Sequence, residues 1–234
     1  MIRIIYEDNH LLVVEKPENM PVQEDQSRDQ DLLNLLKKDL KIRYNKPGEA
    51  FLGLVHRLDR PVGGIMVFAK TSKAASRLSD QIRRNRWKKK YYTVTQNFLN
   101  PQQLDDLLLK DRKTNTTTVS SHGKPSTLII QQTLCQGPFY LLDIDLITGR
   151  SHQIRVQLAH RNAPIWGDQR YNPQAKVGQQ IALFAYELQI EHPTTKKVLT
   201  FRLALPDRFP FNQFLTPEFE TLYPTMFLDH DGEQ

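Results

Sequence analysis

Residues 56–71 read HRLDRPVGGIMVFAKT and place one carboxylate, that of Asp59, among cations at the start of an apolar run. Arg57 and Arg60 flank the carboxylate, and a pair of glycines shortly after it frees the backbone to turn sharply. Residues 65–69 are all apolar and few enough to form a strand buried on both faces. The stretch therefore predicts an ionised carboxylate, held just outside a core strand and offered to a substrate. A solvated surface ion cluster is the alternative.

Apolar runs before and after this stretch predict further strands and helices. Residues 2–6 and 11–15 are rich in β-branched side chains and are separated by turn-forming residues, which predicts two strands joined by a turn. Leucines at helical spacing predict a helix within residues 32–40. Thr71 or Ser72 is placed to cap a second helix. The first third of the chain therefore combines strands with two helices.

Lys16 follows the second of these strands, and two prolines soon after it exclude regular structure. We expect a solvated lysine there, with a phosphate contact as the alternative. The polar residues 23–30 predict a loop.

The densest positive charge lies in residues 83–90, RRNRWKKK, between the second helix and a strand that starts near Tyr91. Such a run is commonly a solvated face. The tryptophan inside it and the abrupt change to strand sequence are equally typical of a rim that follows RNA phosphates. The candidates for phosphate contacts are Arg83, Arg84, Arg86 and Lys89.

Strand character dominates the rest of the chain. The strands are expected at residues 127–134, 139–147, 180–191 and 199–205. Residues 102–110 suggest a short helix or turn, and the Thr-rich residues 113–121 indicate no element. Because strands outnumber helices and lie in hairpin-like sequence, we predict an α+β fold with a largely antiparallel mixed sheet and flanking helices.

Length and composition bound the class of protein. The 234 residues suit one domain, predicted at residues 1–210, with a C-terminal extension at 211–234. A hydrophobic content of 39% and a charged content of 25% are those of a soluble globular protein. The net charge of +6 and pI near 9.3 suit a polyanionic partner without requiring one.

The composition also predicts absences. A single cysteine, Cys135, cannot form an internal disulfide, and no Cys/His group has metal spacing, so we expect a reducing compartment and no metal. No run approaches a membrane span, and the start has no signal-peptide pattern. We therefore expect a cytoplasmic monomer with no separate N-terminal RNA-binding module.

Three stretches together carry a family resemblance. Residues 56–71, the tripeptide Lys89-Lys90-Tyr91, and residues 146–171, LITGRSHQIRVQLAHRNAPIWGDQRY, resemble the motifs of the RluA-type pseudouridine synthases. With the opening strands, the resemblance covers most of residues 2–206. It implies that the protein isomerises a uridine of rRNA or tRNA to pseudouridine, by breaking the uracil N-glycosidic bond and rejoining the base through C5. It implies no cofactor.

The resemblance also implies roles for residues. Asp59 would be the nucleophile, attacking ribose C1′ or uracil C6 or acting in an elimination route, and these three routes stay open. Tyr91 would stack on the base and is a candidate for removing the C5 proton. Arg155 would orient Asp59, because a guanidinium can grip a carboxylate at two points. Arg150 is a weaker candidate that suits an RNA phosphate or a carbonyl at a strand end equally well.

Neighbouring residues are expected to support the structure. Ser151 is a plausible cap for the helix that Pro164 would end, and His152 is expected to donate to backbone and not to act as a base. The residues expected to fix the loop after this helix are Asp168, Arg170 and Tyr171.

A base inside a stack cannot react in this way, so the RNA partner must present a flipped-out uridine. In an extended chain, Arg57 and Asp59 point the same way, so Arg57 is a candidate to fill the gap left by the base, with a phosphate contact as the alternative. Arg60 is a further candidate for binding substrate. Two other functions remain: a non-catalytic RNA-binding or ribosome-assembly factor, and a glycosidic hydrolase, although the latter would need a second carboxylate that is not evident near Asp59.

Overall fold

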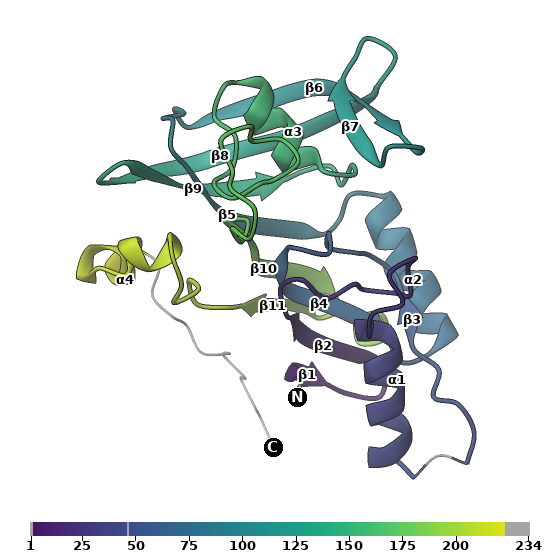
Figure 1. Ribbon diagram of the computed structural model, residues 1–234. Helices are drawn as coiled ribbons and strands as arrows, with labels where there is room; N and C mark the ends of the chain where they lie inside the picture. The colour runs from purple at the N-terminus through teal and green to yellow at the C-terminus, as the bar shows by residue number, and fades with distance from the viewer. Residues whose placement is uncertain (1, 46, 223–234) are drawn as a thin grey trace. The chain divides into compact units, whose positions relative to one another are not determined.

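The computed structural model describes residues 2–45 and 47–222, which form two compact units (Figure 1). The first unit contains the chain up to residue 87 and residues 188–201, and the second contains residues 88–187 and the chain from residue 202. The chain crosses from the second unit into the first within a single strand, β10 (Leu183–Glu191).

The first unit is a small antiparallel sheet with two helices. Its elements are β1 (Arg3–Glu7), β2 (Leu11–Lys16), α1 (Leu32–Arg43), β3 (Gly53–Leu54), β4 (Gly63–Ala69), α2 (Ser72–Arg83) and β11 (Val198–Arg202), the last residue of which belongs to the second unit. Strand β2 pairs antiparallel with both β1 and β4, and the short β3 pairs with β4. Helix α2 packs against β3 and β4, so β4 lies in the core of this unit.

The apolar pattern explains these elements. All seven residues of β4 are buried, as the uninterrupted apolar run predicted. Helix α1 buries Leu32, Leu36 and Leu40, which share one face at helical spacing. Helix α2 begins as expected at Thr71, whose hydroxyl oxygen accepts a hydrogen bond from the Ala74 amide at 3.1 Å.

The second unit is a longer antiparallel sheet. Its elements are β5 (Lys88–Thr95), β6 (Gln102–Asp111), β7 (Thr116–Val119), β8 (Lys124–Gln136), β9 (Phe139–Leu146), α3 (Gln153–His160), the first residues of β10, the 3₁₀ helix η1 (Phe211–Phe214) and α4 (Pro217–Leu222). Strands β5, β9, β8, β6 and β7 are neighbours in that order, and each successive pair is antiparallel. Helix α3 packs against β6 and β7 (Figure 1). The predicted α+β class with a largely antiparallel sheet is confirmed.

The prediction of a short helix or turn at residues 102–110 is wrong, because this segment is strand β6. Leu104 and Leu108 are buried at an even spacing, but the position between them is Asp106, which pairs with Arg161 at 2.8 Å. A carboxylate on the inward face concealed the strand alternation. The unplaced segment 113–121 contains β7, which pairs with the end of β6.

The start of α3 also differs from expectation. Its N-cap is His152 and not Ser151, with a left-handed φ of 55° and no side-chain cap. The Ser151 hydroxyl accepts a hydrogen bond from Lys110 Nζ at 3.0 Å. The Gln153 side-chain oxygen accepts the Arg150 amide at 3.0 Å, and so satisfies a backbone donor just before the helix.

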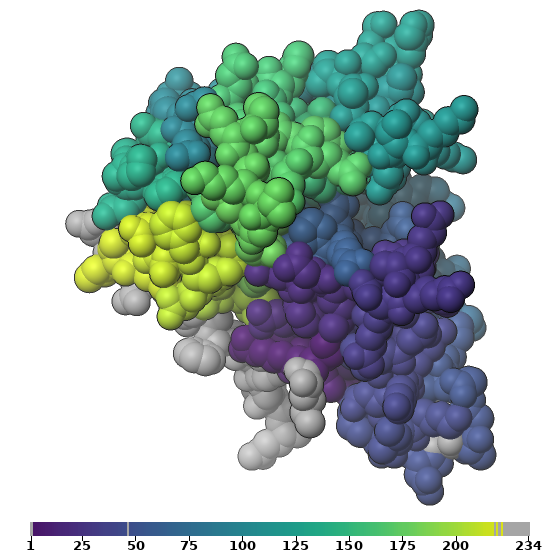
Figure 2. Space-filling view, viewed as in Figure 1, coloured from purple at the N-terminus to yellow at the C-terminus, as the bar shows by residue number. Residues whose placement is uncertain are grey.

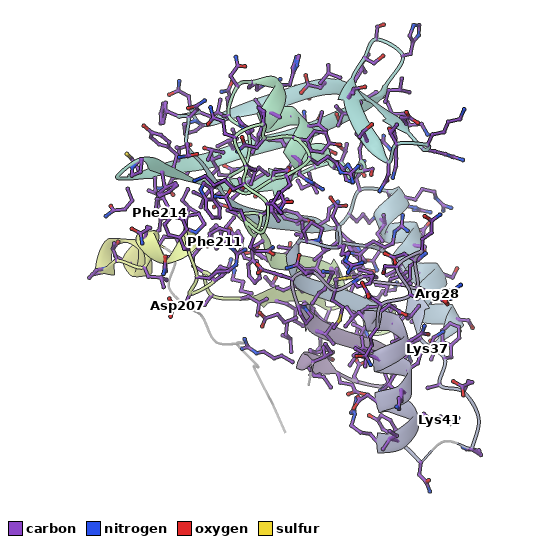
Figure 3. All side chains as sticks on the ribbon, in the orientation of Figure 1. Arg28, Lys37, Lys41, Asp207, Phe211 and Phe214 are labelled. Atoms are coloured by element: carbon purple, nitrogen blue, oxygen red, sulfur yellow. The ribbon has the colours of Figure 1, made fainter. Side chains whose placement is uncertain are left out.

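The C-terminal segment, residues 202–222, packs within the second unit. Phe211 and Phe214 of η1 are buried and are labelled in Figure 3. Figure 2 shows this segment (yellow) beside the loop that follows α3 (green). The rings of Phe209 and Trp166 lie edge to face between them, with centroids 5.1 Å apart. The proposed boundary at residue 210 stays a prediction, and residues 223–234 of the predicted extension lie outside the described residues.

Candidate active site

Asp59 lies in the connection between β3 and β4, as expected for a residue just outside a core strand. The Val62 amide donates to the Asp59 carbonyl oxygen at 2.9 Å and closes a turn. Gly64 follows with a φ of 126°, a conformation that disfavours any residue with a side chain. Leu58 is buried, while Asp59 is only partly so. The turn therefore holds the carboxylate at the edge of the core of the first unit.

The side chain of Lys16 contacts the backbone of this turn. The expectation of a solvated lysine is wrong. Its side chain is only 1% exposed. Its Nζ donates to the carbonyl oxygens of Arg60 at 3.0 Å, Val62 at 2.7 Å and Pro17 at 2.8 Å. Three acceptors match the three N–H groups of an ammonium. Two of them belong to the turn that begins at Asp59.

The charge of Lys16 is sensitive to this location. Burial lowers its pKa to about 7, and the negative charge of Asp59 opposes the shift. The sequence carried a signal for burial, since Lys16 is in phase with Leu12 and Val14 on β2 and lies opposite Gly64 in the β2–β4 pairing. The prolines after it masked that signal.

His56 anchors the other end of the motif. Its Nε2 accepts a hydrogen bond from the Val67 amide of β4 at 3.0 Å, and its ring meets that of Trp87 edge to face at 5.0 Å. Trp87 is buried, and its Nε1 donates to Gln81 at 3.1 Å. The tryptophan inside the basic run is therefore a core residue and lends no support to an RNA-binding rim.

The two arginines beside Asp59 differ from each other. Arg60 pairs with Asp29 and donates to the Ser27 hydroxyl at 3.0 Å, so it ties the loop of residues 23–30 to the Asp59 turn. Arg57 is exposed and makes no hydrogen bond or ion pair with the described residues. Its side chain is thus available to an RNA ligand, which is what both of its predicted roles require.

Tyr91 lies on β5 and is 9% exposed. Its neighbour Tyr92 points to the other face, where its ring stacks on that of Tyr186 with centroids 3.7 Å apart. The Tyr186 hydroxyl donates to Asp143 at 2.9 Å. The strand alternation explains one tyrosine as packing, and the role of Tyr91 stays a prediction.

Arg155 projects from α3 and is buried with Asp168. Its Nε donates to one carboxylate oxygen at 2.8 Å and its Nη2 to the other at 2.6 Å, a two-point grip. Asp168 also accepts the Arg170 amide at 3.0 Å and the Tyr171 amide at 3.3 Å. The expectation that residues 168–171 fix the loop is confirmed. The pairing with Arg155 was missed, because thirteen positions separate the partners.

His152 and Arg150 have structural contacts. The Tyr171 hydroxyl accepts the Thr117 amide at 2.9 Å and lies 2.7 Å from His152 Nδ1, to which it can donate. This contact links His152 to a side chain, where backbone was expected. Arg150 is exposed and its Nε donates to the Pro125 carbonyl at 3.1 Å, which favours the strand-end alternative for this residue.

The cations of residues 83–90 are not equivalent. Arg83 and Arg84 both pair with Asp80, the latter at 3.0 Å. Arg86 is exposed, and its side chain makes no hydrogen bond or ion pair with the described part of the chain. Lys89 is partly buried.

The predicted residues divide between the two units. Asp59, Arg57, Arg60, Arg83, Arg84 and Arg86 belong to the first, and Tyr91, Arg155, Arg150 and Lys89 belong to the second. Within residues 2–45 and 47–222, no group of three or more His, Cys, Asp or Glu side chains is placed to hold a metal ion. No helix in the same ranges has the length and apolar content to cross a membrane.

The chain is similar in sequence to proteins that carry the same name in different bacteria. The chain is 32% identical over 174 residues to the ribosomal large subunit pseudouridine synthase C of Buchnera aphidicola subsp. Acyrthosiphon pisum, which covers 72% of this chain and 54% of the relative. It is 30% identical over 211 residues to the enzyme of the same name from Vibrio cholerae, covering 86% and 65%. The chain thus spans between about half and two thirds of these relatives.

A solved structure shares the fold. Human RNA pseudouridylate synthase domain containing 4 superposes with a TM-score of 0.73 at 22% identity, covering 90% of each chain. The family profile described as RNA pseudouridylate synthase matches residues 10–160, a range that contains Asp59, Tyr91 and Arg155. The chain therefore belongs to the RNA pseudouridylate synthase family.

Proposed function

We propose that the protein is an RNA pseudouridine synthase. The observation that carries the proposal is the family match over residues 10–160, which contains the motif carboxylate, tyrosine and arginine together. The similar enzymes are named for the ribosomal large subunit, so large-subunit rRNA is the preferred substrate over tRNA. We further propose that the protein acts as a cytoplasmic monomer on a flipped-out uridine.

In this reaction the C1′–N1 bond of a uridine breaks and a C1′–C5 bond forms. C5 loses its proton and N1 gains one, so atoms and charges balance without a co-reactant. Asp59 serves as the nucleophile, on a turn that the Lys16 ammonium holds by the carbonyls of Arg60 and Val62. A fixed turn favours catalysis, because the carboxylate does not have to be ordered in each reaction cycle.

Tyr91 stacks on the uracil and Arg155 orients Asp59. Asp168 occupies the Nε–Nη2 edge of the Arg155 guanidinium and sets the plane of that group. A guanidinium fixed in this way can hold the Asp59 carboxylate in one orientation for attack. Arg57 and the cations of residues 83–90 bind RNA.

The test is release of tritium from RNA that contains 5-tritiated uridine, with large-subunit rRNA transcripts as substrate. Asp59→Asn should abolish release while it changes RNA affinity little, because shape and hydrogen bonding survive but the nucleophile does not. Asp207→Asn is the matched control, since Asp207 is an exposed carboxylate of the C-terminal segment (Figure 3). Turnover by Asp59→Asn within about tenfold of the parent would reject the assignment. RNA binding without tritium release by the parent would favour the non-catalytic alternative.

A further inference from the structure

Lys89 differs from the two lysines beside it. Lys88 is exposed, and Lys90 Nζ lies 3.4 Å from a carboxylate oxygen of Asp145. Lys89 is partly buried, and its side chain makes no hydrogen bond or ion pair within residues 2–45 and 47–222. A partly shielded cation without an anion is disfavoured, because it has lost part of its hydration without compensation.

Desolvation alone accounts for the state of this side chain. Burial lowers the pKa of Lys89, and no carboxylate opposes the shift. Lys16, by contrast, is more deeply buried but has three carbonyl acceptors. The fold therefore provides three acceptors for the ammonium of Lys16, whereas the partly buried Lys89 side chain has no partner among the described residues.

The location of Lys89 indicates what would satisfy it. Side chains alternate along β5, so Lys89 lies on the same face as Tyr91, while Lys90 lies on the other face with Asp145. The Nζ atom of Lys89 is 3.3 Å from the position that a Cβ atom on Gly149 would occupy. A side chain at position 149 would press on the ammonium, so glycine there lets Lys89 Nζ lie close to the backbone just before α3.

We propose that Lys89 binds a backbone phosphate next to the uridine that Tyr91 contacts, as a dedicated anchor for the reacting nucleotide. This assignment rests on the proposed function and extends it. A phosphodiester carries a full negative charge within one nucleotide of the base, so it can pair with a cation on the face that holds Tyr91. The exposed arginines of residues 83–90 differ, because water and, for Arg83 and Arg84, the Asp80 carboxylate already satisfy them, and each contributes only general affinity.

The experiment removes the charge of Lys89 and the charge of one RNA phosphate, separately and together, and asks whether the two effects on rate are independent. The substrate is a short RNA around the uridine first mapped as pseudouridine with the parent protein. One charge-neutral methylphosphonate replaces either phosphate that flanks this uridine, and all substrates, charged or neutral, carry the same blocked 2′ position next to the linkage. Single-turnover rates at subsaturating protein are compared for the parent, Lys89→Met and Lys88→Met.

We expect Lys89→Met to lower the rate at least tenfold with the charged RNA. At one of the two linkages, the methylphosphonate should cost the parent a similar factor and Lys89→Met almost nothing further, since the contact is already lost. Lys88→Met is the matched control. Its factor on the rate and that of the methylphosphonate should multiply, because the two changes act independently. Lys89→Arg should recover part of the rate, because it keeps the charge.

Folding is monitored by thermal unfolding of each variant. Because the partly shielded Lys89 side chain has no partner in the described residues, Lys89→Met should melt no lower than the parent. Multiplicative effects at both linkages would overturn the phosphate assignment, and a rate loss without coupling would place Lys89 at the base instead. If the parent forms no pseudouridine, the proposed function itself fails and the anchor with it. Product formation without coupling rejects the anchor alone.

Discussion

The Nζ atom of Lys16 lies 2.7 Å from the carbonyl oxygen of Val62. Val62 is three residues beyond Asp59, and its amide donates to the Asp59 carbonyl oxygen to close a turn. The same nitrogen donates to the Arg60 carbonyl at 3.0 Å. A buried cation thus holds the backbone on the C-terminal side of the proposed nucleophile. Because the contacts are to backbone, they constrain the position of Asp59 without occupying its carboxylate.

Replacement of Lys16 by methionine should lower both stability and turnover. Methionine retains most of the volume but leaves buried carbonyls without a donor, at a cost of about 1–3 kcal/mol in the free energy of unfolding. A less ordered Asp59 turn should reduce turnover at saturating RNA by at least tenfold. Urea unfolding and tritium release measure the two effects.

Lys70→Met is the control for this variant. Lys70 Nζ pairs with Glu7 at 2.7 Å, also in the first unit, and lies over the ring of Tyr44. Its loss should reduce stability and leave turnover within about twofold. Equal loss of turnover in both variants would mean that general destabilisation, and not the hold on the turn, is responsible.

The pKa of Lys16 predicts how stability depends on pH. The folded value is about 7 and the ordinary value is 10.5, so between these pH values the unfolded chain binds more protons than the folded chain. The free energy of unfolding contributed by Lys16 should therefore rise as pH increases from 7 toward 10.5 and be constant below 7. Between pH 7 and pH 9.5 the parent should gain on the order of 3 kcal/mol relative to Lys16→Met, at about 1.4 kcal/mol per pKa unit. Urea unfolding of both proteins at pH 7 and pH 9.5 tests this, and parallel pH profiles would contradict it.

Arg155 and Asp168 give a third prediction. Arg155→Lys should lose about ten- to a hundredfold in turnover, because an ammonium cannot replace a planar two-point contact that contributes roughly 1.5–3 kcal/mol. Asp168→Asn should destabilise the protein by about 3–5 kcal/mol, since it leaves a buried guanidinium without its carboxylate.

Arg161, the C-cap residue of the same helix, provides the comparison. It pairs with Asp106 at 2.8 Å, and Arg161→Lys should leave turnover nearly unchanged. Near-parental turnover of Arg155→Lys would show that Arg155 does not orient Asp59, and Arg150 would then be the next candidate to replace.

The sequence predicted those elements in which the pattern of apolar side chains is uninterrupted by a buried polar residue. Strand β4 is apolar throughout, and α1 carries leucines at helical spacing, so both were identified. Strand β6 was misassigned because Asp106 occupies an inward position and finds its partner, Arg161, 55 residues later. A sequence pattern reports the average environment of a side chain, and it cannot report a partner that the fold brings from far along the chain.

The same reason limits what could be inferred about the site. The motif identified Asp59, Tyr91 and Arg155 by resemblance. The groups that position them were missed or misread: Lys16 appeared solvated because prolines follow it, and Asp168 was assigned to a loop but not to Arg155. A buried lysine is so unfavourable in isolation that only its three carbonyl partners explain it.

Tyr91→Ala should reduce turnover at saturating RNA by about 5- to 100-fold, because a lost stack of about 1–3 kcal/mol misplaces the base after binding. The salt dependence of RNA affinity should not change, since no charge is removed. Tyr92→Phe is the control, because the ring that stacks on Tyr186 is retained. Parental turnover of Tyr91→Ala would show that Tyr91 is only a structural residue of β5.

The basic run of residues 83–90 should supply affinity that does not depend on RNA sequence. Each phosphate contact on single-stranded RNA contributes roughly 0.7 to the slope of log affinity against log salt. Replacement of Arg83, Arg84 and Arg86 by glutamine should weaken binding at low salt and flatten this slope, with turnover at saturating RNA preserved. Filter binding between low and physiological salt measures the slope.

Two comparisons separate local contacts from net charge. Replacement of Lys37, Lys38 and Lys41 by glutamine removes the same charge from α1, where Lys37 and Lys41 are labelled in Figure 3, and should leave the slope unchanged. Asp80→Asn should tighten binding at low salt and steepen the slope, because it releases Arg83 and Arg84 from their shared carboxylate. If the slope is the same for the parent and the arginine triple variant, the run does not contact RNA. If both triple variants flatten it equally, the effect is that of net charge, since long-range attraction depends on total charge and not on which side chains carry it.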